Sequence, residues 1–142
     1  MSTIKNNLTV QPYLFFNGRC EEALEFYRKA LDAEVSFLMR YKDSPASATS
    51  HGFENKVMHA NFRIGRTEIM GSDGNSDEGP NFQGFALTLT VATEAEANRL
   101  FAALEQGGQV QMPLSRTFYS PRFGMVTDRF GILWMILTAA EA

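Results

Sequence analysis

The chain has 142 residues, of which 44% are hydrophobic and 12% aromatic, and its formal net charge is −3. This apolar content is enough for a well-filled core, which argues against an intrinsically disordered protein. No run of Lys or Arg resembles the basic surface that binds a phosphate backbone, so no nucleic acid partner is expected. The single cysteine, Cys20, excludes an intrachain disulfide and a paired-cysteine zinc site.

Localisation is predicted from what the sequence lacks. The first residues contain no apolar segment typical of a signal peptide. No stretch approaches the roughly 18 apolar residues that a membrane-spanning helix needs. A chain with one cysteine suits a reducing compartment. We therefore expect a cytoplasmic protein without a membrane partner.

The first half of the chain predicts a strand, a helix and a second strand. Residues 9–16 are β-branched and aromatic, and Asn17-Gly18 interrupts them, as at the end of a strand. From Glu21 onward, apolar residues recur with helical spacing, and acidic residues lie at the expected N-terminus. Residues 35–41 predict the second strand, and residues 42–56, rich in Ser, Ala and Asn, predict a long exposed loop.

Residues 56–70 predict a β-hairpin. Gly65-Arg66 lies between two alternating runs, and a two-residue loop that begins with Gly suits a type II′ turn. With Ile64 opposite Thr67, alternation places the hairpin side chains on two faces. The apolar face carries Met58, Ala60, Phe62, Ile64, Thr67 and Ile69, and the polar face carries His59, Asn61, Arg63, Glu68 and Met70.

The second half repeats the pattern after a turn-rich connector at residues 71–84. Residues 85–91 predict a strand, and Thr93-x-x-Glu96 is a capping box. The helix that follows has an apolar stripe and ends before Gly107-Gly108. Three strands complete the pattern. The stripe is Ala97, Leu100, Phe101 and Leu104; the strands are 109–112, 123–127 and 132–138, with a loop at 114–121 and turn residues Asp128 and Gly131.

The order strand, helix, three strands therefore occurs twice, in modules at about residues 8–70 and 85–138 of a single domain. This repetition predicts an α+β fold of two βαβββ modules. The same order also fits a pair of ferredoxin-like units, so the residue pattern leaves both arrangements open.

Three sequence blocks carry a resemblance to a known family. PYLFFNGRCEEALEFYRKAL, KVMHANFRIG and MPLSRTFYSPRFGMVTDRFGILWMI resemble the PhnB-like branch of the vicinal-oxygen-chelate (glyoxalase, bleomycin resistance and dioxygenase) superfamily, from about Val10 to Leu137. The resemblance implies a curved eight-stranded mixed sheet around a cup, with helices on its convex side, in a homodimer. Related sequences carry a demethylubiquinone methyltransferase label, yet this chain has no Gly-rich loop of the S-adenosylmethionine-binding kind.

The resemblance also implies positions for metal ligands. Gln11 lies near the first-strand ligand position of glyoxalase I enzymes, and Glu68 lies near their fourth-strand glutamate, so Gln11, His59 and Glu68 form a weak candidate set. In the second half, Ala86, Thr88 and Thr90 stand where a His is expected, and Trp134 or Met135 where a Glu is expected. Because Thr and Met bind divalent metals poorly, we expect neither a complete metal site nor a metal cofactor.

Two residues are candidate general bases. The His59 imidazole can exchange protons at neutral pH, and the Glu68 carboxylate can accept one. Each also has a structural interpretation, as a hydrogen-bonded strand histidine and as the partner of Arg63 in a cross-strand ion pair. In the second half, Tyr119 and Arg122 could close over an anionic ligand, or serve in surface packing or a dimer contact.

Three functional hypotheses follow. The first is a protein that binds a small polar or anionic metabolite without a complete metal site. The second is an enzyme, either a lyase or isomerase with Glu68 or His59 as base, or a divalent-metal enzyme. The third is a mainly structural dimer. The residues expected to bind the ligand are Gln11, Tyr13, Arg63, Thr88, Tyr119, Arg122 and Trp134.

Overall fold

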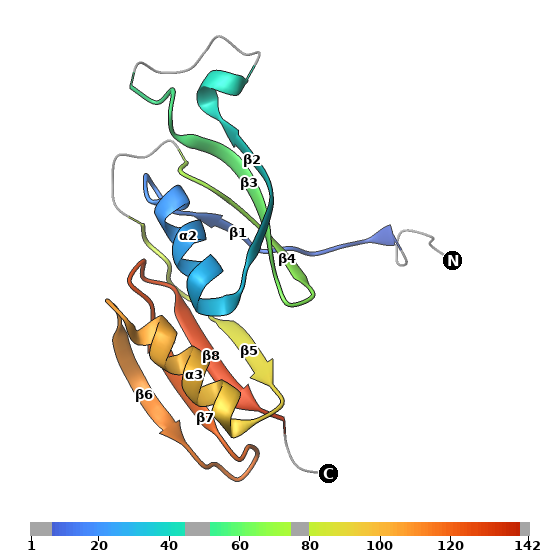
Figure 1. The fold of residues 1–142 in the computed structure, drawn as a ribbon, viewed down its shortest axis with the longest axis vertical. Helices are drawn as coiled ribbons and strands as arrows, with labels where there is room; N and C mark the ends of the chain where they lie inside the picture. Colours follow the sequence, from blue (N-terminus) through green and yellow to red (C-terminus); the bar gives the residue numbers. More distant parts are fainter. Residues whose placement is uncertain (1–6, 45–51, 75–79, 140–142) are drawn as a thin grey trace. The chain divides into compact units, whose positions relative to one another are not determined.

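The computed structural model describes residues 7–44, 52–74 and 80–139. Within them, the predicted order of strand, helix and three strands occurs twice and is confirmed (Figure 1). The eight strands of the described residues form two four-stranded mixed sheets, ordered β1-β4-β3-β2 and β5-β8-β7-β6. The chain divides into two compact units at about residue 77, apart from residues 29–31, which group with the second. No helix among the described ranges is long and apolar enough to cross a membrane.

The N-terminal unit contains one four-stranded sheet and one long helix. β1 pairs with β4 in parallel, and the other neighbours are antiparallel. β1 is shorter than the predicted strand because Pro12 has no N–H to continue the ladder, although its carbonyl accepts from Met70 N (2.9 Å). The elements are β1 (Tyr13–Phe15), α2 (Cys20–Leu31), β2 (Glu34–Arg40), a 3₁₀ helix (Tyr41–Asp43), β3 (Val57–Ile64) and β4 (Thr67–Ser72).

The β3–β4 hairpin has the predicted register. Ile64 lies opposite Thr67, and Arg63 lies opposite Glu68. Gly65 has φ 58° whereas Arg66 keeps a negative φ, as a type II′ turn requires and a type I′ turn does not. The apolar face of the hairpin packs under α2, where the Tyr27 ring stacks on Phe62 with centroids 6.2 Å apart. β4 continues to Ser72, two residues into the predicted connector.

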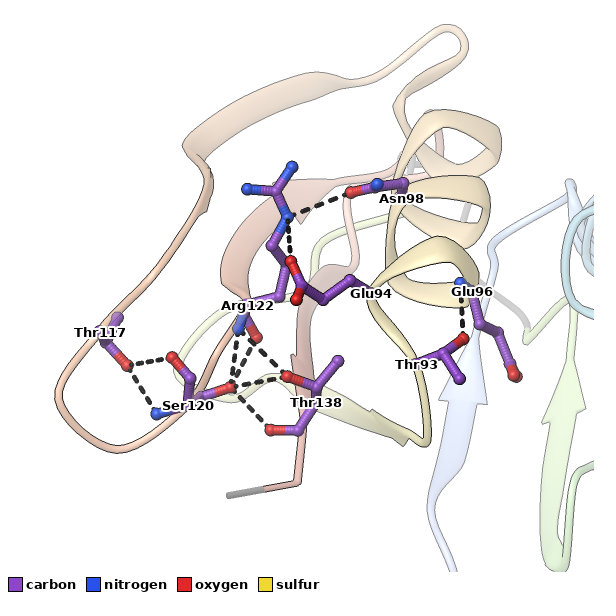
Figure 2. Close-up of polar contacts among 8 residues, drawn as sticks. All are labelled: Thr93, Glu94, Glu96, Asn98, Thr117, Ser120, Arg122 and Thr138. Carbon is purple, nitrogen blue, oxygen red and sulfur yellow. Dashed lines mark hydrogen bonds and ion pairs between the residues drawn. The ribbon is translucent and has the colours of Figure 1, made fainter. Parts of the chain in front are cut away.

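The C-terminal unit repeats the arrangement. Its elements are β5 (Leu87–Val91), α3 (Glu94–Glu105), β6 (Gln109–Ser115), β7 (Phe123–Thr127) and β8 (Leu133–Thr138). The predicted apolar stripe of α3 is buried in full. Thr93 caps the helix, because its Oγ1 accepts from Glu96 N at 3.1 Å (Figure 2). β6 extends beyond the predicted residues 109–112, since an edge strand tolerates Pro113.

Two buried aspartates tie these elements together. Asp73 follows β4, and its carboxylate accepts from Cys20 N (2.8 Å) at the start of α2 and from Val57 N (2.7 Å) at the start of β3. Asp128 lies between β7 and β8, in the turn that the sequence predicted, and accepts from three donors of the same unit. Each residue is less than 5% exposed. Their carboxylates therefore stabilise the fold.

Candidate functional site

One side of the N-terminal sheet is covered by α2, and the other side carries the polar hairpin residues. We call this second side the open face. Strand pairing and alternation assign its members, opposite to the buried Leu14, Ala60 and Phe62. The open face comprises Tyr13, Phe15, Phe37, Met39, His59, Asn61, Arg63, Glu68 and Met70.

A chain of hydrogen bonds crosses the open face from β1 to β4. Tyr13 Oη lies 3.0 Å from His59 Nδ1, and His59 Nε2 lies 2.6 Å from Asn61 Oδ1. Asn61 Nδ2 donates to Glu68 Oε1 at 3.1 Å. The structure thus brings together three predicted residues, Tyr13, His59 and Glu68, through an asparagine that was not among the predicted site residues. The sequence had already placed Asn61 on the polar face of the hairpin, and this placement is the feature from which its role in the site could have been predicted.

The Glu68 carboxylate determines the direction of this chain. An ionised carboxylate only accepts, so the Asn61 amide turns its NH₂ group to Glu68 and its oxygen to His59. His59 Nε2 therefore carries a hydrogen. In the neutral imidazole, Nδ1 is then an acceptor, and the Tyr13 hydroxyl donates to it.

Aromatic rings form a row on the same face. The Phe15 and Tyr13 rings stack with centroids 4.8 Å apart, Tyr13 and His59 lie 5.5 Å apart, and His59 and Phe37 lie 6.1 Å apart. The two phenylalanines at the ends are 54% and 44% exposed. Sequence reasoning missed Phe15 and Phe37 as site residues, although Phe15 shares the strand face of Tyr13 by alternation.

Arg63 does not pair with Glu68. Its Nη2 binds Glu34 Oε2 on β2 at 2.7 Å, so the predicted cross-strand ion pair is wrong although the predicted register is right. Arg63 lies opposite a glutamate on each neighbouring strand, and the side chain turns to β2. The positive charge on the open face is therefore neutralised by Glu34.

The candidate metal set of the first half does not fit a metal ion. Gln11 is exposed and precedes β1. Both ring nitrogens of His59 are engaged in hydrogen bonds, and Glu68 holds Asn61. Within residues 7–44, 52–74 and 80–139, no group of three or more His, Cys, Asp or Glu side chains is placed to hold one. A ligand needs a free lone pair, which His59 lacks in this arrangement.

Three predicted ligand-binding residues of the C-terminal unit lie at its surface. Arg122 Nε donates to Asn98 Oδ1 (3.3 Å) and lies 3.9 Å from Glu94 Oε1, so its side chain rests on the first turns of α3 (Figure 2). Tyr119 is 46% exposed, and its ring contacts Phe123. Thr88 is exposed on β5. None of these contacts shows a ligand site.

The loop that carries Tyr119 is held by a buried serine. The Ser120 hydroxyl oxygen lies 2.7 Å from the carbonyl oxygens of both Arg122 and Thr138, to either of which its single hydrogen can be donated, and Thr117 Oγ1 accepts from Ser120 N at 3.0 Å (Figure 2). The loop is therefore anchored to the end of β8, and its aromatic tip projects from a fixed base.

Trp134, which the sequence suggested as a ligand-binding residue, lies in the core of the C-terminal unit. Its residue is 2% exposed, and its indole Nε1 donates to the buried Asp128 Oδ2 at 2.8 Å. Its neighbour Met135 is partly exposed and lies opposite Thr88 and Met125. One of the two had to face away from the helix, and the hydrogen bond to Asp128 places the indole in the core.

Cys20 is not a reactive residue. Its thiol is buried at the start of α2. Burial raises the pKa of the Cys20 thiol well above its usual range, and the negative charge of Asp73 raises it further. The thiol therefore stays protonated, and a protonated thiol is a poor nucleophile.

Two mixed sheets, each built from strand, helix and three strands, define an α+β protein of the duplicated βαβββ class. A fosfomycin resistance protein, FosX from Mesorhizobium loti, has the same fold at 11% identity, with a TM-score of 0.63 over 92% of this chain and 90% of that one. Such low identity supports the shared fold alone.

Sequence relatives identify the family. A family model described as 3-demethylubiquinone-9 3-methyltransferase matches residues 8–137. Protein YjdN of Escherichia coli is 33% identical over 138 residues, 91% of this chain and 94% of its own. The solved structure of PA1353 from Pseudomonas aeruginosa is 39% identical, with a TM-score of 0.83 over 94% and 99% of the two chains. A Bacillus cereus PhnB protein is 32% identical, with a TM-score of 0.76 over 93% and 100%. The chain belongs to the family that this family model describes, which includes the PhnB-like proteins.

Proposed function

We propose that this protein binds a small polar molecule on the open face of the N-terminal sheet, without a bound metal or other cofactor. The observation that carries the proposal is the row of partly exposed rings from Phe15 to Phe37, crossed by a hydrogen-bond chain whose members are all partnered. Binding sites of small molecules typically combine aromatic surface with a few polar groups that fix orientation. Exposed apolar surface rimmed by polar groups also marks interaction sites.

The family description names a methyltransferase, but the first strand–helix connection does not favour that activity. A nucleotide-type cofactor binds where a Gly-rich loop opens onto free amides at a helix N-terminus. Here the connection is Asn17-Gly18-Arg19, and the Asp73 carboxylate already accepts from Cys20 N. We therefore do not propose methyl transfer for this site.

A fragment screen followed by NMR tests the proposal. The methionine ε-methyl groups of Met39 and Met70 report on the open face, and Met58, on the opposite face of β3, is an internal control. Neutral, cationic and anionic fragments, both aromatic and aliphatic, are added to the full chain at millimolar concentration. We expect some of them to shift Met39 and Met70 but not Met58. The shifts should disappear in a Phe15→Ala, Phe37→Ala double variant.

The proposal fails if no fragment moves the two reporter methyl groups, or if the shifts persist in the double variant. Wild-type and variant spectra in the absence of fragments show whether the variant has kept its fold.

Acid–base catalysis at the same face is the second candidate function. The observation that favours it is the link from the Glu68 carboxylate through Asn61 and His59 to the Tyr13 phenol. A reaction would appear in the same spectra as conversion of a bound fragment, and Glu68→Gln should abolish that conversion while leaving binding in place. Conversion at an unchanged rate in Glu68→Gln would rule out Glu68 as the base.

We also propose that the chain forms a homodimer. The loop anchored by Ser120 presents Phe118, which is fully exposed, and Tyr119, whose ring lies 5.0 Å from that of Phe118. Aromatic residues projecting from a fixed loop are suited to an interface between subunits. Sedimentation velocity at micromolar concentration should show a dimer, and Phe118→Ser should weaken it. A monomeric wild-type protein would contradict this proposal.

A further inference from the structure

We infer that the molecule bound by the open face carries a flat aromatic ring and a hydrogen-bond donor, and no negative charge. This inference rests on the proposed function, because it names the chemical class of the ligand for the same face. It departs from the sequence-based expectation, which allowed an anionic metabolite. Three properties of the described residues support it.

The first property is the direction of the hydrogen-bond chain. When His59 is neutral with its hydrogen on Nε2, the Tyr13 hydroxyl hydrogen is used toward His59 Nδ1, so the phenolic oxygen keeps only lone pairs for a ligand. Glu68 uses Oε1 to accept from Asn61, and its second carboxylate oxygen is again an acceptor. The Asn61 amide keeps one N–H that is not used toward Glu68. At the two ends of the chain, however, the Tyr13 phenolic oxygen and the second Glu68 oxygen only accept, so a ligand that binds at either end must donate.

The second property is the charge of the face. Arg63 is the cation that would attract an anion, and Glu34 binds it at 2.7 Å. In the described ranges, Glu68 makes no ion pair with Lys, Arg or His. The chain between Tyr13 and Glu68 thus ends in a carboxylate that makes no ion pair among the described residues, and its negative charge disfavours a carboxylate or a phosphate relative to a neutral or cationic donor.

The third property is the aromatic row. Phe15, Tyr13, His59 and Phe37 follow one another across β1, β3 and β2, with centroid separations of 4.8, 5.5 and 6.1 Å. The exposed phenylalanines at either end offer apolar surface to a ring of matching shape. A planar ring can lie along this row while its donor reaches Tyr13 Oη.

Three naphthalene probes share the aromatic ring and test separately the requirement for a hydrogen-bond donor and the exclusion of a negative charge. 2-Naphthol has the ring and a donor, 2-methoxynaphthalene has the ring without a donor, and 2-naphthoate has the ring with a negative charge. Dissociation constants are measured from the Met39 and Met70 methyl shifts of the full chain at pH 7. We expect 2-naphthol to bind about three- to tenfold more tightly than 2-methoxynaphthalene, as one hydrogen bond allows, and 2-naphthoate to bind most weakly.

A matched pair of variants assigns the preference to one residue. Tyr13→Phe should reduce the ratio between 2-naphthol and 2-methoxynaphthalene to about one. Tyr41→Phe removes the same atom from another tyrosine of this unit, whose hydroxyl donates to Gly74 O, and should leave the ratio unchanged. Imidazole ¹⁵N spectra supply a second readout. They should show neutral His59 protonated at Nε2 in the wild type and a mixture of tautomers in Glu68→Gln.

The inference is overturned if 2-naphthoate binds as tightly as 2-naphthol, if Tyr13→Phe keeps the preference, if none of the probes binds, or if wild-type His59 carries its hydrogen on Nδ1. Failure of the wider proposal is distinguishable from these results. If other fragments still shift Met39 and Met70, the proposal of small-molecule binding stands although this inference fails. If no fragment shifts these methyl groups, both the proposal and this inference fail.

Discussion

Asp128→Ala is expected to lower the free energy of unfolding of the C-terminal unit by about 3–5 kcal/mol. The Asp128 carboxylate accepts from Phe130 N (2.8 Å), Ile132 N (3.1 Å) and Trp134 Nε1 (2.8 Å). All four residues are buried, so alanine would leave three donors without a partner where water does not replace it. The cost of a buried unsatisfied donor is about 1–3 kcal/mol, which makes the sum large even if the turn relaxes.

Urea denaturation followed by tryptophan fluorescence measures this loss directly, because Trp134 is the only tryptophan and belongs to the network. Glu105→Ala is the control from the same unit. Glu105 is exposed near the end of α3, so this variant should lose less than about 1 kcal/mol. Equal losses in the two variants would show that the buried network does not stabilise the unit as described.

Asp73→Ala is expected to destabilise the N-terminal unit by about 2–4 kcal/mol. Asp73 binds Cys20 N and Val57 N, which lie 53 and 16 residues away in sequence, and it is 4% exposed. Without the carboxylate, the start of α2 and the start of β3 each lose an acceptor. The negative charge at the N-terminal end of the α2 dipole is lost as well.

The Cys20 thiol is the reporter for this variant. Burial is the main cause of its raised pKa, and the charge of Asp73 contributes in the same direction. Removing Asp73 lowers the thiol pKa toward its ordinary value and loosens the helix start, so both effects increase the thiolate that a reagent can reach. A disulfide reagent should therefore modify Asp73→Ala several-fold faster than wild type. Glu25→Ala, on the exposed side of α2, is the control, and equal rates in the two variants would contradict the role given to Asp73.

Local sequence signals were sufficient for the hairpin and for α3. Gly65-Arg66 determines the turn, the turn determines the register, and the register determines which side chains of β3 and β4 share a face. In α3, the spacing of the apolar residues predicted the four that are buried. These predictions succeeded because each depends on residues close together in the chain, whose periodicity follows from the geometry of helix and strand.

The candidate site could be predicted only in part from such local sequence signals. The polar face of the hairpin was recognised, but the bond between Tyr13 and His59 joins residues 46 positions apart and requires β1 to add in parallel beside β4. Phe37 reaches His59 only because irregularities in β2 adjust its register to β3. Neither the parallel pairing of β1 with β4 nor the register shift in β2 can be predicted from a short window of sequence.

The sequence alone thus determined the order of the elements, the two faces of the β3–β4 hairpin, the buried stripe of α3, and the family, since all of these depend on local pattern. Tertiary structure decided which partner each polar side chain chose. Arg63 lies between two glutamates and bound Glu34, and Trp134 turned its indole to Asp128 in the core rather than outward. Alternation along a strand determines which face of the sheet a side chain occupies. Its hydrogen-bond or ion-pair partner is determined by the nearest complementary group, which another strand or turn contributes.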